Sequence, residues 1–195
     1  MSSNEIQEVC THMGHQITAR LKDEEKAPIF LCVMKGAMNF TVDLIKHVHC
    51  PIITDFIQIS SYEGTESTGK INLLKDLTYD PEGRTIVICE DVVDTGLSMK
   101  YLVDYLKEKY HPKDIIVACL FDKVAARRCD VKIDYYGKRL EENAFLVGYG
   151  LDYRELHRND AFVFVPTPED VKEWDELLDK NPVKKINRWG LIFSF

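Results

Sequence analysis

The residues with the clearest capacity for chemistry stand at positions 90–98. Glu90 and Asp91 directly follow the apolar run 85–89, and Asp94 comes three residues later. Carboxylates accept hydrogen bonds from sugar hydroxyls and bind magnesium, and a suitably placed one accepts a proton from a reacting group. This grouping predicts a site for a hydroxylated or metal-bound substrate.

A short loop and a helical pattern follow these carboxylates. Thr95 and Ser98 offer hydroxyl donors, and Gly96 lets backbone N–H groups approach a ligand closely. Because the helical pattern begins near Leu97, unpaired N–H groups and the positive end of a helix dipole face the same place. The loop therefore predicts a cradle for a phosphate group.

Other interpretations of this segment remain open at this point. Asp94 or Thr95 could simply cap the helix, which needs no ligand. The triplet 94–96 also matches the active triplet of aspartic proteases, but that fold is nearly all β, whereas here the triplet opens a helical pattern. Neither the dinucleotide-binding nor the P-loop glycine pattern is present.

The elements that must position these residues follow from hydrophobic periodicity. Short apolar runs alternate with helical patterns of 10 to 15 residues, which favours an α/β fold with a mostly parallel central sheet flanked by helices. Ligands of such sheets bind beyond the carboxyl ends of the strands. We expect strands at 29–34, 52–59, 85–89 and 115–121, shorter ones at 71–74, 135–136, 145–147 and 162–165, and helices at 6–21, 37–48 and 97–110.

Further polar residues follow the other predicted strands. Lys35-Gly36 follows the first strand and Lys123 the fourth, and the polar, glycine-bounded segment 63–69 predicts a mobile loop. Taken alone, Lys35 and Lys123 read as surface lysines, Phe145 as a core side chain and Arg158 as a surface arginine.

Considered together, these motifs resemble the type I phosphoribosyltransferase family, and more narrowly its hypoxanthine-guanine members. Residues 90–96 are similar to the family's sugar-phosphate signature, 34–36 to its pyrophosphate loop and 145–153 to the segment that closes over the base. The motifs occur in the family order between about residues 6 and 166. Ala37 departs from the pattern, because many members carry a second glycine there.

The resemblance implies a fold and a reaction. It implies a phosphoribosyltransferase domain at 1–166, with a core at about 27–135 and a small hood lobe formed by the N-terminal segment and 136–166. Residues 167–195 would be a C-terminal extension of unknown role. The implied reaction transfers the 5-phosphoribosyl group of magnesium-bound 5-phosphoribosyl 1-diphosphate to hypoxanthine or guanine, giving IMP or GMP and pyrophosphate. It also implies a cis peptide bond between Met34 and Lys35.

The resemblance also assigns roles to residues. Asp94 would be the general base, Ser61 and Tyr62 would begin a lid, and Glu90, Asp91 and Asp152 would hold Mg²⁺. Lys35, Gly36 and Arg158 would bind pyrophosphate. The purine would contact Lys123, Phe145, Leu146 and Asp152, and the ribose and 5′-phosphate would contact Glu90, Asp91, Val93, Asp94, Thr95, Gly96, Leu97 and Ser98.

Composition argues against some classes of partner and against one of the alternative functions. The chain has 195 residues, a formal charge of −7 and six cysteines without C-x-x-C spacing. The acidic balance argues against nucleic-acid binding, and thus against a sugar-phosphate-binding regulator on the same fold. A transferase for adenine or orotate is a further rival, which Lys123 and 145–152 disfavour. We expect a cytoplasmic protein without membrane contact, forming a homodimer or homotetramer as the resemblance implies.

Overall fold

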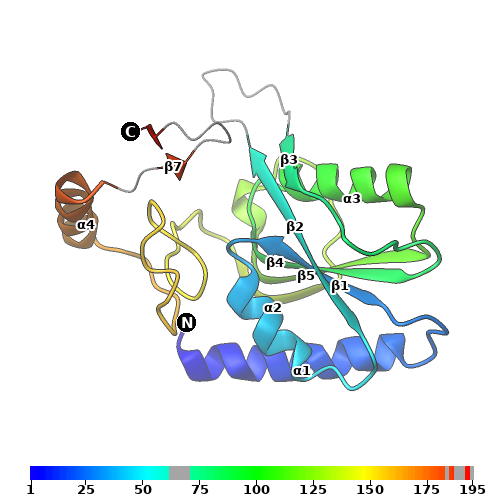
Figure 1. Cartoon of the computed structure of the whole chain (residues 1–195). Helices are drawn as coiled ribbons and strands as arrows, with labels where there is room; N and C mark the ends of the chain where they lie inside the picture. The colour runs from blue at the N-terminus through cyan, green and yellow to red at the C-terminus, as the bar shows by residue number, and fades with distance from the viewer. Residues whose placement is uncertain (62–70, 183–184, 187–191, 194–195) are drawn as a thin grey trace.

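A computed structural model describes residues 1–61, 71–182, 185–186 and 192–193 (Figure 1). Its centre is a six-stranded sheet with strand order β3-β2-β1-β4-β5-β6. All neighbouring pairs are parallel except β2 and β3, which pair antiparallel. The strands are β1 (Ile29–Met34), β2 (Ile53–Ser61), β3 (Ile71–Lys75), β4 (Thr85–Val93), β5 (Asp114–Lys123), β6 (Tyr135–Leu140), β7 (Lys185–Ile186) and β8 (Ile192–Phe193).

Helices cover both faces of the sheet, as predicted (Figure 1). One face packs against α1 and α2, and the other packs against α3, so side chains that alternate along β1 and β4 enter two separate cores. This double burial explains why these strands read as continuous apolar runs. The helices are α1 (Ser3–Leu21), α2 (Met38–Ile45), α3 (Leu97–Tyr110) and α4 (Pro168–Lys180), with a 3₁₀ turn at Val124–Ala126.

The first helix shows how local sequence sets an element. Ser2 and Glu5 form a capping box at its start, which satisfies N–H groups that no helical carbonyl can reach. Its buried residues recur every three or four positions and face α2 and the sheet. The expected pattern at 6–21 is confirmed.

Four expectations on strands and helices need correction. The helix expected at 37–48 ends at Ile45, and the strand expected at 85–89 continues to Val93 because β5 pairs with it over its whole length. The described residues 145–147 and 162–165 do not form the two expected strands. Only an antiparallel bridge between Val147 and Phe164 forms there.

Residues 141–166, which belong to the hood that the resemblance implies, are built from turns and isolated bridges, whereas 136–140 lie in β6 of the central sheet. Gly148, Tyr149 and Gly150 all have positive φ, so the chain reverses after Val147 and leaves no room for a longer strand. The Met1 ammonium donates to the Val163 carbonyl at 2.7 Å, which ties the N-terminal segment to the hood.

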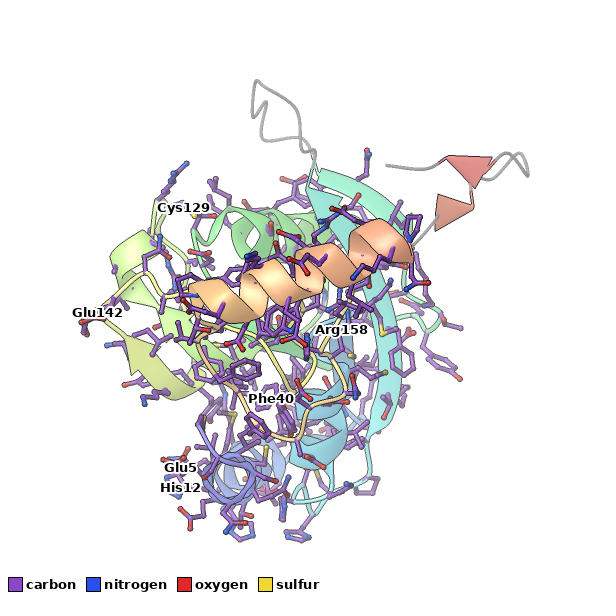
Figure 2. The ribbon with its side chains drawn as sticks, turned by 90° about the vertical axis from the view of Figure 1, so that its left-hand side faces the viewer. Glu5, His12, Phe40, Cys129, Glu142 and Arg158 are labelled. Carbon is purple, nitrogen blue, oxygen red and sulfur yellow. The ribbon has the colours of Figure 1, made fainter. Side chains whose placement is uncertain are left out.

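The helix α4 packs against the hood (Figure 2). Its buried Trp174 lies 4.1 Å from the His157 ring and 5.5 Å from the Tyr153 ring, between ring centroids. Asp175 binds Arg154 at 2.7 Å. None of the helices in the described part of the chain has the length and apolar character that a bilayer crossing requires.

Candidate functional site

A small cavity of about 100 Å³ lies where β4 ends and α3 begins. Gly96 precedes α3 with φ +81°, and a methyl group there would lie 2.9 Å from Arg127 Cδ and 3.2 Å from Cys129 Sγ. Gly96 is therefore required by both its backbone angle and its surroundings. The cavity is lined by Glu90, Val92, Val93, Asp94, Thr95, Gly96, Ser98 and Met99.

The simple capping interpretation of this loop is only partly correct. The Thr95 hydroxyl accepts from the Leu97 N–H at a long 3.4 Å, whereas no side chain bonds as a regular cap. Asp94 points elsewhere, since its carboxylate lies 3.6 Å from the Lys123 ammonium. Asp94 therefore does not cap α3, and its carboxylate faces Lys123 instead.

Asp94 and Lys123 come from neighbouring strands. In the pairing of β4 with β5, Val93 lies opposite Asp122, so the residues that follow, Asp94 and Lys123, meet at the carboxyl edge of the sheet. The Lys123 side chain is 8% exposed and that of Asp94 is 48% exposed. The sheet thus presents an accessible carboxylate beside a nearly buried cation.

Asp122 and Arg127 complete this edge. The buried Asp122 carboxylate accepts from Arg127 and from Arg139. Among the described residues, Arg127 Nε is a buried side-chain nitrogen without a hydrogen-bond partner. Sequence reasoning did not identify Arg127, and no local pattern distinguishes it from the adjacent Arg128.

Glu90 and Asp91 lie within β4, next to the loop after β1. Burial, and then the charge of Asp91, raise the pKa of Glu90 well above its usual value. The Asp91 carboxylate rests against Gly36, where a Cβ atom would be only 1.9 Å from Oδ2. Two adjacent carboxylates that repel each other favour a cation or hydroxyl donors between them.

The loop after β1 also contacts the hood. The Met34–Lys35 peptide bond is cis, as the resemblance implied. A Cβ atom on Gly150 would lie 2.1 Å from the Gly36 carbonyl oxygen, so the two backbones touch. Asn39 donates to the Arg158 carbonyl at 3.1 Å, which anchors the same part of the hood on α2.

Four charged side chains meet at this contact. Glu155 lies 3.0 Å from Lys35 and 3.3 Å from Arg158, and Arg158 lies 2.8 Å from Asp152. Partial burial acts to raise the pKa of Glu155, but the bond from Lys35 and the charge of Arg158 hold it below its usual value. The structure thus brings together the predicted Lys35 and Arg158, with Glu155 between them, a residue that sequence reasoning missed.

The remaining predicted residues are placed as follows. Phe145 is 53% exposed and meets Tyr153 edge-on at 6.2 Å, so it is not the core side chain that it resembles in isolation. Leu146 packs partly against the core. Ser61 ends β2, whereas Tyr62 and the predicted loop at 63–69 lie outside the described residues.

Comparison with known proteins agrees with this architecture. The family model of the phosphoribosyl transferase domain matches residues 2–154. A hypoxanthine-guanine phosphoribosyltransferase of Bacillus subtilis is 39% identical over 169 residues, covering 86% of this chain and 92% of that protein. A hypoxanthine phosphoribosyltransferase structure from Staphylococcus aureus superposes with a TM-score of 0.81 at 35% identity, covering 86% of this chain and 90% of that one.

The fold and the strand-end site define a type I phosphoribosyltransferase, a transferase enzyme. The chain belongs to this family, among relatives named as its hypoxanthine-guanine members. The hypoxanthine phosphoribosyl transferase of Trypanosoma cruzi superposes with a TM-score of 0.83 at 29% identity, covering 90% of this chain and 93% of that one. A structural study of that enzyme concerns the role of its C-terminal region in oligomeric state and activity.

Proposed function

We propose that this protein acts in purine salvage, transferring the 5-phosphoribosyl group from 5-phosphoribosyl 1-diphosphate to hypoxanthine or guanine. The products are IMP or GMP and pyrophosphate. The observation that carries this proposal is the pair formed by Asp94 and Lys123 at the rim of the phosphate cradle. One group can accept a proton and the other can only donate, which suits the N7 and O6 edge of a 6-oxopurine.

In this proposal the base binds between Lys123 and Phe145. Lys123 donates to the exocyclic oxygen, and it would disfavour adenine because an ammonium group cannot accept from an amino group. Asp94 accepts the N7 proton as the new bond forms at the sugar carbon. Phe145 stacks on the ring, while the backbone of Leu146 and the region of Asp152 contact the base edge.

The sugar binds along the end of β4. Glu90 and Asp91 accept hydrogen bonds from the ribose diol, and the cradle binds the 5′-phosphate through N–H groups at the start of α3. Arg127 lies beside this cradle and adds a positive charge. The proposed ribose and 5′-phosphate contacts are Glu90, Asp91, Val93, Asp94, Thr95, Gly96, Leu97 and Ser98.

The leaving pyrophosphate binds at Lys35, Gly36 and Arg158. Oxygen donors fit Mg²⁺, and the mutual repulsion of Glu90 and Asp91 supports a cation beside them. Asp152 would act through water, because its carboxylate already forms an ion pair with Arg158 and accepts from the Glu155 N–H. Magnesium, when bound, would neutralise charge on the leaving group. Ser61 and Tyr62 would begin a lid that keeps water from the oxocarbenium-like sugar.

A spectrophotometric assay of each purine with the activated sugar and magnesium tests the proposal. We expect turnover with hypoxanthine and guanine and none above background with adenine or orotate. Xanthine should be included, since it is also a 6-oxopurine. Turnover of adenine or orotate alone, or none with any base, would contradict the proposed function.

Further proposals concern organisation and location. We propose that 1–166 form the transferase domain and that 167–195 extend it, with the Met1–Val163 contact supporting an N-terminal contribution to the hood. Exposed Met38 and Val42, one turn apart on α2, support assembly into a homodimer or homotetramer. All six cysteines are free thiols, which supports a reducing, cytoplasmic environment.

A further inference from the structure

A carboxylate lies between the two cations proposed to bind pyrophosphate. Glu155 Oε2 accepts from Lys35 Nζ at 3.0 Å and from both Arg158 Nε and Arg158 Nη2 at 3.3 Å. The three side chains are 36%, 49% and 25% exposed, so the cluster is open to solvent on one side. An anion that binds Lys35 and Arg158 must therefore compete with Glu155.

The backbone holds Glu155 in this place by an unfavourable turn. Tyr153 and Leu156 exchange both backbone hydrogen bonds, which makes 153–156 a two-residue hairpin. Its central residues, Arg154 and Glu155, have φ of +49° and +77°, angles for which such turns normally use Asn or Gly. Non-glycine residues in this conformation cluster at functional sites.

Contacts on opposite sides fix the two central side chains of this turn. Arg154 binds Asp175 of α4 at 2.7 Å, while Glu155 turns toward Lys35 and Arg158. The Glu155 N–H donates to Asp152 at 2.7 Å, so its backbone is also tied to the site. A Glu155 side chain displaced by a ligand would therefore stay close to that ligand.

We propose that Glu155 is a specificity-determining residue, a displaceable counter-ion that makes the site prefer magnesium-bound pyrophosphate to the free anion. This inference rests on the proposed function. Free pyrophosphate carries several negative charges and is repelled by the tethered carboxylate, whereas the magnesium complex carries fewer. Without a ligand, Glu155 neutralises Lys35 and Arg158 and weakens the binding of other small anions.

Calorimetric titration with inorganic pyrophosphate tests this inference without measuring catalysis. The full chain and its E155Q variant are titrated with pyrophosphate, once with magnesium and once with a chelator. E142Q is the matched control, because Glu142 is an exposed residue well separated from Arg158 (Figure 2). Thermal unfolding of each variant checks that the fold is intact.

The measured quantity is a ratio: the dissociation constant of pyrophosphate without magnesium divided by its dissociation constant with magnesium. We expect E155Q to lower this ratio about fivefold, chiefly by tightening the binding of free pyrophosphate, as a repulsion of about 1 kcal/mol would produce. E142Q should leave it unchanged. An unchanged ratio in E155Q, or weaker binding in both conditions, would overturn the inference. A wild-type protein that binds pyrophosphate in neither condition would instead refute the proposed function.

Discussion

Replacing Gly36 by alanine tests the closest contact in the site. A Cβ atom there would lie 1.9 Å from Asp91 Oδ2 and 2.6 Å from Asp91 Cγ. Real Cβ contacts stay beyond 3.0 Å, so the loop and the carboxylate must separate by at least 1.1 Å. The substitution therefore displaces either the proposed pyrophosphate loop or a proposed ribose and metal ligand.

The structure indicates how much stability and how much catalytic rate this displacement should remove. Asp91 is buried, and its Oδ1 accepts from the Val92 N–H at 2.9 Å, a bond that is lost if the carboxylate turns away. Because the side chain can rotate, we expect a stability loss of about 1 kcal/mol, at the low end for an overpacked site. A misplacement of about 1 Å in a catalytic site costs on the order of 100-fold in rate.

The assay is kcat/KM for the activated sugar, with thermal unfolding measured in parallel. Gly137→Ala is the control, because its Cβ atom would meet Val9 Cγ1 at 2.7 Å and the Leu120 carbonyl oxygen at 2.8 Å, in the packing of α1 on β6. We expect this control to lose stability and keep its KM. A Gly36→Ala variant within about threefold of wild-type kcat/KM would show that the contact is not functional.

Three further changes have defined outcomes. Asp94→Asn should lower turnover by about 10²- to 10⁴-fold with little change in sugar binding, and near-normal turnover would exclude Asp94 as the base. Lys123→Met should raise KM for hypoxanthine and guanine and leave sugar binding intact; equal losses for both substrates would make Lys123 structural. Asp76→Asn tests a pH effect: burial acts to raise the pKa of Asp76, but bonds from Lys109 and Tyr105 lower it to about 2. The folded protein thus favours the ionised form of Asp76, so the variant should lose about 1–2 kcal/mol of unfolding free energy at pH 7. In urea unfolding at several pH values, that difference should shrink as pH falls from about 4 toward about 2 and should be absent below; a difference that persists in acid would refute the assignment.

The sheet was predictable because its parallel strands are buried on both faces. Apolar runs marked β1, β4 and β5 directly. The continuation of β4 through Glu90 and Asp91 was not visible, since polar residues end an apolar run and only pairing with β5 shows the strand going on. The strand expected at 145–147 is likewise reduced to one bridge, because the chain turns at Gly148, Tyr149 and Gly150. The sequence does not show that all three of these residues adopt positive φ.

The site was predictable where a strand end and a motif coincide, as at Asp94 and Lys123. Glu155 was missed because its partner Lys35 is 120 residues away in the sequence, and an Arg-Glu dipeptide is no signal for a tight turn. The helix α4 could have been found. Thr167 and Asp170 form a capping box around Pro168, a start signal that is readable in the sequence.

The two-sided core has a consequence for synthesis on the ribosome. The face of the sheet that packs on α1 and α2 receives its helices early, because both precede residue 46. The opposite face, with Leu31, Val33 and Ile57, packs against α3, whose residues 97–110 are made much later. A nascent chain that ends before α3 therefore exposes a strip of aliphatic side chains, the kind of surface that chaperones bind. Translation stalled with α3 still inside the ribosomal exit tunnel, and again after α3 has left the tunnel, would show whether chaperone binding ends when that helix emerges.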